Sequence, residues 1–149
     1  MKKLRILVFE DDSSLANLVK FSLVQKGHEV QIFSDPTLCP VYLNHAMQCP
    51  SPTACADVII TDQMMPNMTG LEFLKFQRMR GCKALDENKA IITASVMNAE
   101  MKESINQLGC HYIRKPFHVA TVIKWVDECA MRLQKSASPT FPKVRSDYP

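Results

Sequence analysis

The chain has 149 residues and a formal net charge of +3, with 46% hydrophobic and 22% charged residues. This length suits one domain that buries most of its apolar surface around a single core. The charge is too small, and the basic residues are too scattered, to indicate direct nucleic-acid binding. No apolar run approaches the roughly 20 residues of a membrane-spanning helix. The basic start soon runs into acids, so it predicts a first strand instead of an export signal.

Six cysteines lie at positions 39, 49, 55, 82, 110 and 129, and no two of them form a CxxC pair. Without an export signal they predict a cytoplasmic protein with reduced thiols, not a disulfide framework. Cys39, His45, Cys49 and Cys55 are close enough in sequence to consider a metal site. Their spacing matches no usual zinc motif, so a loop with buried or free thiols is the favoured interpretation.

The first predicted strand covers residues 4–9 and ends at three acids, positions 10–12. Asp12 or Ser13 can cap the helix that follows, and Gly27 lies just past the end of that helix. The core-facing residues of this helix are predicted to be Leu15, Leu18, Val19 and Val24.

A second short strand is predicted around Val30 and Ile32, where apolar and polar residues alternate. Asp35 then has the position of a helix cap, with Pro36 in the first turn. Pro40 would remove a hydrogen bond from a helix interior, so the second helix is expected to be kinked or to begin near Pro40. A proline-containing loop is predicted over residues 48–54.

The third predicted strand, residues 58–61, is apolar, rich in β-branched residues and followed at once by Asp62. A lone carboxylate at the end of a buried strand is costly unless it is paired, coordinated or used. Met65-Pro66 then breaks the strand pattern, and Thr69-Gly70 opens a helix. Asp62 is therefore the first candidate for chemistry.

The second half of the chain continues the alternation of helices and strands. A helix that ends near Gly81 is followed by a polar loop over residues 82–89 and a strand over residues 90–93. A helix capped by Asn98 closes at Gly109, and a short strand at residues 112–113 precedes the last helix. The apolar faces of these three helices are predicted to contain Leu71, Phe73, Leu74 and Met79; Met101, Ile105 and Leu108; and Val119, Val122, Ile123, Val126, Ala130 and Leu133.

Five strands alternating with five helices predict an α/β fold, with a doubly wound parallel sheet covered on both faces. Periodicity stops near Gln134, and Pro and Ser become frequent. We therefore expect one domain over residues 1–134 and a flexible tail, or the start of a linker, over residues 135–149.

The carboxyl ends of parallel strands meet at one edge of a sheet, where ligands bind in open α/β folds. This edge should gather Glu10 and Asp11, Asp62, Thr93 and Lys115. Three carboxylates repel one another unless a cation joins them, and oxygen ligands suit Mg²⁺ or Mn²⁺ better than zinc. The lysine and the hydroxyl could bind a phosphoryl group that Asp62 attacks.

The ordered motifs resemble the receiver domains of two-component response regulators, including the stand-alone chemotaxis type. The matching segments are ILVFEDD at 6–12, DVIITDQMMPNMTGLEFL at 57–74, IITAS at 91–95 and YIRKPF at 112–117. Thr93 follows Asp62 by 31 residues, and Lys115 follows Thr93 by 22. The resemblance implies a flavodoxin-like (βα)5 fold with strand order 2-1-3-4-5.

The resemblance also implies a role for each site residue. Asp62 would be the phospho-acceptor and a metal ligand, and Thr93 the switch hydroxyl that moves onto a phosphoryl oxygen. The metal would also be bound by Asp11, by the backbone carbonyl of Met64 and, through water, by Glu10. Lys115 would bind a phosphoryl oxygen, and the peptide bond between Lys115 and Pro116 would be cis. The small side chain of Ala94 would leave the approach to the acyl phosphate open. Tyr112 would be an aromatic switch residue or would simply pack against the core.

By the same resemblance the protein would not be an enzyme in the ordinary sense, since it would catalyse only its own phosphorylation and slow dephosphorylation. The phosphoryl donor would be a sensor histidine kinase or a histidine phosphotransfer protein. An output partner would bind the face formed by residues 98–133, and a homodimer is also compatible. Two alternatives stay open: a receiver-like module that works without phosphorylation, and a Mg²⁺-dependent phosphohydrolase, which would want a second acid where Met64 stands.

One departure from the family concerns chain length, because Asp62 follows Asp11 by 51 positions, with the excess around residues 48–54. Among the aromatic residues, Trp125 is expected to cover part of the core, with a partner contact as the alternative. The four histidines, His28, His45, His111 and His118, have no partner pattern and are expected at surface or loop positions.

Overall fold

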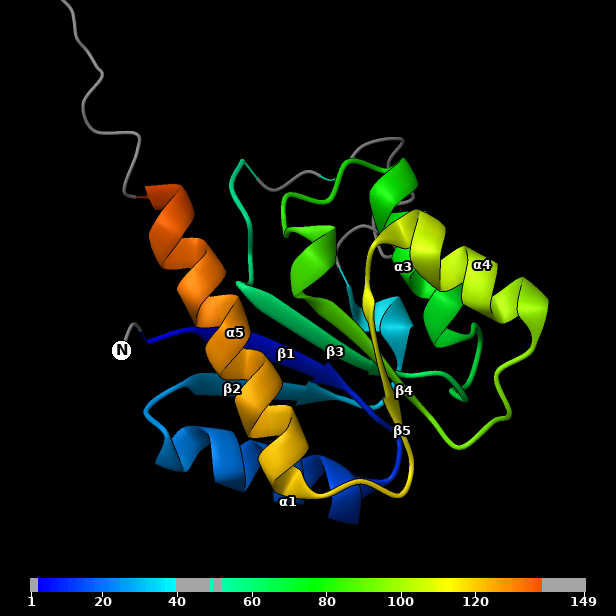
Figure 1. Ribbon diagram of the computed structural model, residues 1–149. Coiled ribbons are helices and arrows are strands. Elements are labelled where there is room, and N and C mark those ends of the chain that lie inside the picture. The colour runs from blue at the N-terminus through cyan, green and yellow to red at the C-terminus, as the bar shows by residue number, and fades with distance from the viewer. Residues whose placement is uncertain (1–2, 40–48, 50–51, 138–149) are drawn as a thin grey trace, which may run out of the picture.

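Five parallel strands form a single sheet in the order β2-β1-β3-β4-β5 in the computed structural model, which describes residues 3–39, 49 and 52–137 (Figure 1). The strands are β1 Arg5–Phe9, β2 Glu29–Phe33, β3 Val58–Asp62, β4 Lys89–Thr93 and β5 His111–Arg114. The predicted fold class and strand order are therefore confirmed.

Burial along the strands follows their place in the sheet. Every residue of β3 and β4 is buried, because helices cover both faces of these inner strands. In β2, at one edge of the sheet, only Val30 is buried. The two fully buried strands are therefore β3, which ends at Asp62, and β4, which pairs with it.

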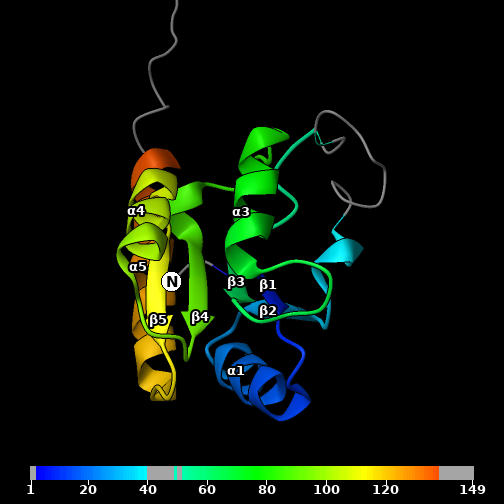
Figure 2. The ribbon, with the colours of Figure 1, turned by 90° about the vertical axis from the view of Figure 1, so that its right-hand side faces the viewer.

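The helices divide between the two faces of the sheet. The α-helices are α1 Ser13–Gln25, α3 Gly70–Met79, α4 Ala99–Leu108 and α5 Val119–Ala137, and the short 3-10 helices are η1 Pro36–Leu38 and η2 Asp86–Asn88. Residues of α1 and α5 share one core cluster with one face of the sheet, and α3 and α4 share the other. Figure 2 shows α1 and α3 on opposite sides of β1 and β3.

The predicted helix ends are confirmed by their hydrogen bonds. The Asp12 carboxylate accepts from the backbone N–H groups of Ser14 and Leu15, and the Asp35 carboxylate accepts from that of Thr37. Asn98 caps α4, and Gly109 ends it with a positive φ of 71°. These local patterns fix where each helix begins and ends.

Three residues that were predicted to face the core do not. Leu18, Val24 and Met79 are 49%, 46% and 71% exposed. In α1 the buried residues are Ala16, Val19 and Leu23, so the helix turns a narrower stripe toward the sheet than its apolar content suggested. Large apolar residues on a surface are common, because a small domain lacks the polar surface to cover itself.

Other boundaries also differ from the expectation. Helix α5 continues to Ala137, beyond the boundary predicted at residue 134. The predicted polar loop over residues 82–89 contains η2, and both Asn88 and Lys89 are buried. The second predicted helix, His45 and most of the loop over residues 48–54 lie outside the described residues. Within the part that is described, no helix is long and apolar enough to span a membrane.

Trp125 is 3% exposed and belongs to the core cluster shared by α1 and α5, so the prediction of core cover is confirmed. The ring of His111 stacks on its indole, with centroids 5.4 Å apart and planes 8° from parallel. His111 and His118 are exposed, as predicted for surface positions.

His28 corrects the prediction of a surface histidine, because it is only 4% exposed. Its Nδ1 accepts a hydrogen bond of 3.1 Å from the backbone N–H of Leu4, which ties the start of β2 to the start of β1. Burial lowers the pKa of His28 below its usual 6.5, and this outweighs the opposite effect of Asp127. Protonation at Nδ1 would also remove the acceptor of that bond.

We expect acidification to destabilise the protein through His28. Because the pKa is lower in the folded state, the stabilisation is present above pH 6.5 and is lost as the pH falls through the folded-state pKa, with a slope of at most about 1.4 kcal/mol per pH unit. Urea unfolding between pH 8 and pH 5.5 measures this slope. The variant His28→Asn keeps an acceptor near Nδ1 and cannot titrate, so its slope should be smaller; equal slopes would contradict the prediction.

Candidate metal and phosphoryl site

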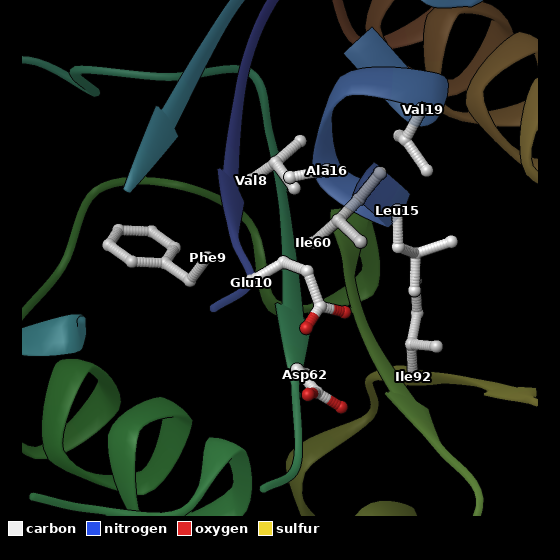
Figure 3. A pocket seen from close by; sticks show the side chains of 9 residues that line it. All are labelled: Val8, Phe9, Glu10, Leu15, Ala16, Val19, Ile60, Asp62 and Ile92. Carbon is white, nitrogen blue, oxygen red and sulfur yellow. The ribbon is translucent and has the colours of Figure 1, made fainter. Parts of the chain in front are cut away.

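Carboxylates gather where β1 and β3 end. The two strands are neighbours in the sheet, and Phe9 pairs with Thr61, so Glu10 and Asp11 emerge beside Asp62. Carboxylate oxygens of Glu10, Asp11 and Asp62 all lie within 4.8 Å of one another, and within the described ranges no other grouping of this kind is found. Figure 3 shows the side chains of Glu10 and Asp62 turned toward the same space, next to apolar residues.

Lys115 brings one positive charge to this cluster. Its Nζ lies 3.2 Å from Oε1 of Glu10 and 3.2 Å from Oδ1 of Asp62. The backbone N–H of Lys115 donates to the carbonyl of Thr93 at 2.9 Å, which fixes the end of β5 beside the end of β4. The peptide bond between Lys115 and Pro116 is cis. One ammonium therefore contacts two of the three carboxylates in the cluster, Glu10 and Asp62.

The electrostatics of the cluster reflect this imbalance. Burial, more than any other factor, raises the pKa of Glu10 to about 7, and the neighbouring charge of Asp62 adds to the effect. For Lys115, burial lowers the pKa, but the charges of Asp62 and Glu10 outweigh it and the net shift is upward. A further cation would relieve the repulsion between the carboxylates, and their all-oxygen chemistry fits a hard divalent ion.

Thr93 and Ala94 complete the edge of the site. Thr93 is buried, and its Oγ1 accepts a 2.9 Å hydrogen bond from the backbone N–H of Ser95. Ala94 is exposed, so no bulky side chain covers that approach. Tyr112 is partly buried against the core cluster shared by α3 and α4. The structure thus brings Thr93, Ala94 and Lys115 to the edge where the carboxylates lie, whereas Tyr112 lies within β5, where it pairs with Ile91.

Gln63 and Gly70 shape the backbone around Asp62, a role that was not predicted for either residue from the sequence. Gln63 is buried, its backbone N–H donates to Oδ1 of Asp62 at 2.9 Å, and its Oε1 accepts from the N–H of Leu71 at 2.9 Å. A Cβ placed on Gly70 would lie 2.4 Å from the carbonyl oxygen of Asp62. A glycine directly after a predicted helix cap is the sequence signal that could have indicated this close approach.

The three cysteines of the other candidate metal site all lie in the described part of the chain and form no disulfide bonds. Cys39 is buried, Cys49 is half-buried and Cys55 is exposed. His45, the remaining member of that grouping, lies outside the described residues. Residues 39, 49 and 55 do not appear among the described side chains that could hold a metal together.

The chain matches the response regulator receiver domain over residues 6–127. It is 27% identical to a probable transcriptional regulatory protein of Picosynechococcus over 126 residues, 81% of this chain and 47% of the relative. It is 26% identical to the alkaline phosphatase synthesis transcriptional regulatory protein SphR of Synechococcus elongatus, with 95% and 54% of the two chains covered. The chain thus spans about half the length of these curated relatives.

Solved structures agree with this match. The receiver domain of the Francisella response regulator 1452 superposes with a TM-score of 0.71 at 24% identity, covering 88% of this chain and 99% of that one. The Vibrio cholerae chemotaxis response regulator CheY4 gives a TM-score of 0.66 at 26% identity, with 86% and 99% covered.

The parallel sheet ends in an acidic cluster beside a lysine, and the family model matches most of the chain. The chain belongs to the response regulator receiver domain family. It is therefore a signalling domain of two-component systems and not an enzyme in the ordinary sense. Phosphoprotein character and Mg²⁺ binding are typical of this family.

Proposed function

We propose that this receiver accepts a phosphoryl group on Asp62 from a phosphohistidine of a sensor histidine kinase or a histidine phosphotransfer protein. The observation that carries the proposal is the convergence of Glu10, Asp11 and Asp62 within 4.8 Å beside Lys115. In this transfer a carboxylate oxygen of Asp62 forms a bond to phosphorus while the bond from phosphorus to the histidine nitrogen breaks. The electron pair of the broken bond stays on that nitrogen, and the imidazole, which carries a proton on its other ring nitrogen, leaves as neutral histidine while Asp62 becomes an aspartyl phosphate.

Four residues of this chain are assigned to hold the metal ion. Asp11 and Asp62 would bind it directly, with the backbone carbonyl of Met64, and Glu10 would contact it through water. When bound, Mg²⁺, or Mn²⁺ in its place, supplies positive charge to the transferring phosphoryl oxygens. Lys115, already 3.2 Å from Asp62, is placed to hold one phosphoryl oxygen.

The response to phosphorylation is assigned to Thr93 and Tyr112. Thr93, whose Oγ1 accepts from the N–H of Ser95, would move to donate its own O–H to a phosphoryl oxygen, and Tyr112 would then turn inward into the space that Thr93 leaves. Phosphorylation would shift an equilibrium between two conformations toward the one that binds the output partner. We assign that partner to the face of residues 98–133, with no direct nucleic-acid contact by this domain, and leave self-association as a further property to be measured.

The proposal is tested by incubating the protein with Mg²⁺ and a small acyl-phosphate donor and following the intact mass. We expect one added phosphoryl group that requires Mg²⁺ and is absent from Asp62→Asn. No adduct with catalytic consumption of the donor would instead favour a phosphohydrolase. No adduct and no consumption would favour a module that works without phosphorylation. Met64, two residues after Asp62, provides no carboxylic acid for hydrolytic turnover.

Mg²⁺ is expected to stabilise the folded protein. At a Mg²⁺ concentration one hundred times its Kd, the free energy of unfolding should rise by about 2.7 kcal/mol, since the site forms only in the folded state. Urea unfolding with and without Mg²⁺ measures this difference. Asp11→Asn should abolish most of it, whereas Asp12→Asn, which changes the charge equally and keeps the cap of α1, should not. Equal losses in both variants would contradict the assigned ligand.

A further inference from the structure

The loop that joins β3 to α3, residues 63–69, carries the Met64 carbonyl that we assign to the metal. The base of this loop is closed, because the N–H of Gly70 donates to the carbonyl of Gln63 at 3.0 Å. Beyond the base, the Met64 side chain is 65% exposed and so contributes little to fixing the loop. The next residue, Met65, accepts from Oγ1 of Thr61 at 3.6 Å and packs with Met68 against the core, so the orientation of this carbonyl depends on contacts further along the loop.

Asn67 has an unusual conformation within this loop. Its φ is 73°, which makes it the residue other than glycine with a positive φ in the described part of the chain. Asparagine is one of the few residues that adopt this left-handed region at modest cost. The conformation turns the chain between Pro66 and Met68, whose N–H donates back to the Pro66 carbonyl at 2.9 Å.

The side chain of Asn67 crosses to a different part of the fold. Its Nδ2 donates to Oδ2 of Asp35, a residue that follows β2 and is 32 positions away in sequence. Figure 2 shows the loop after β3 reaching toward the segment that follows β2. The contact therefore joins the loop after β3 to the segment after β2, at the same edge of the sheet.

Asp35 is itself held in place. Its Oδ1 accepts from the N–H of Thr37 at 2.8 Å, and it caps η1, whose first residue is the buried Pro36. Although burial raises the pKa of Asp35, its hydrogen bonds with Thr37 and Asn67 lower it overall. Asp35 is thus an ionised and anchored acceptor, and hydrogen bonds to charged groups are stronger than those between neutral groups.

We propose that Asn67 and Asp35 are positioning residues for the metal site: their hydrogen bond holds the loop after β3 so that the Met64 carbonyl faces the carboxylates. Neither residue is assigned as a ligand of the metal or of the phosphoryl group. The inference rests on the proposed function, because it assigns a purpose to the loop only if that site binds Mg²⁺. A flexible loop would have to be ordered when the ion binds, and this ordering would weaken affinity.

The test compares Mg²⁺ affinity with stability in a set of matched variants. Asn67→Gly removes the amide and keeps a residue that accepts positive φ, so it isolates the hydrogen bond from the backbone conformation. We expect this variant to bind Mg²⁺ about tenfold more weakly, as measured by calorimetry. Its free energy of unfolding without metal should change by no more than the extra backbone freedom of glycine accounts for. Backbone amides of residues 64–68 should also exchange hydrogen faster in the metal-free variant.

Exchanging the residue types at positions 35 and 67 separates the effect of the hydrogen bond from the effect of the charge. Asn67→Asp places two carboxylates together and should weaken Mg²⁺ binding more than Asn67→Gly, although it adds a negative charge. The double variant Asp35→Asn with Asn67→Asp has the charge of the natural protein and reverses donor and acceptor, so it should restore the affinity to within about threefold.

The possible outcomes test the positioning role and the proposed function separately. Natural affinity in every variant, or a double variant no better than Asn67→Asp alone, would overturn the positioning role while leaving the proposed function intact. Failure of the natural protein to bind Mg²⁺ would overturn the proposed function and this inference with it.

Discussion

Alanine in place of Gly70 is expected to destabilise the protein by about 2 to 3 kcal/mol and to prevent phosphorylation of Asp62. The new Cβ would lie 2.4 Å from the carbonyl oxygen of Asp62 and 3.2 Å from Cα of Gln63. Both neighbours are backbone atoms, so no flexible side chain can move aside. The clash would displace α3 or the end of β3, which carries the phospho-acceptor.

The direction of the stability change in Gly70→Ala distinguishes a steric clash from a helix preference. Gly70 lies in the first turn of α3, where alanine normally favours the helix over glycine by up to about 1 kcal/mol. A destabilised variant therefore reports the close approach and not a helix preference.

Gly109→Ala provides the matched control for Gly70→Ala. Its Cβ would meet nothing within 4 Å, but its φ of +71° disfavours alanine. It should lose about 1 kcal/mol of stability and still accept a phosphoryl group. Chemical unfolding and intact mass after incubation with the donor measure both properties. A Gly70→Ala variant as stable and as readily phosphorylated as the natural protein would contradict the prediction.

Replacing Lys115 with methionine is expected to slow phosphorylation by about a hundredfold or more, because a fixed positive charge beside the reacting oxygens is lost. The reason is geometric: Nζ lies 3.2 Å from carboxylate oxygens of both Asp62 and Glu10. The rate is measured from the intact mass at several times after addition of the acyl-phosphate donor and Mg²⁺. Phosphorylation at the natural rate would show that Lys115 does not contact the phosphoryl group.

The same substitution should also destabilise the metal-free protein. Removing Lys115 leaves the buried Glu10 and Asp62 without their shared cation, and loss of one partner of a buried ion pair is costly. Because the Lys115 side chain is 23% exposed, we expect about 1 to 2 kcal/mol. Adding Glu10→Gln to the Lys115→Met variant removes one of the two unpaired carboxylates, so it should recover part of the lost stability. Additive effects of the two substitutions would indicate that the charges are not coupled.

The corrections to the sequence analysis share one cause. His28 has no local pattern that marks it as buried, and its burial depends on the backbone of Leu4, 24 residues away. Leu18 and Val24 have the apolar character of core residues, yet the position of α1 against the sheet leaves them exposed. In each case the deciding contact is with a distant segment, which periodicity within one helix does not describe.

The sequence by itself determined the five strands, the capped ends of α1, α3 and α4, and the grouping of the carboxylates. Asp62 follows a β-branched run, and the acids after Phe9 follow another, so parallel pairing of these strands brings the carboxylates together. Caps such as Asp12 and Asn98 act through backbone groups two or three residues away. Such local interactions can be predicted from residue type and spacing alone.

Only the tertiary structure decided which groups meet across these elements. It set the approach of Gly70 to the carbonyl of Asp62, the two contacts of Lys115, and the hydrogen bond between Asn67 and Asp35. These contacts depend on the relative placement of segments tens of residues apart, which packing of the whole core fixes to a fraction of an ångström. Residue types and their spacing do not contain that placement, because it results from many side chains filling the same space.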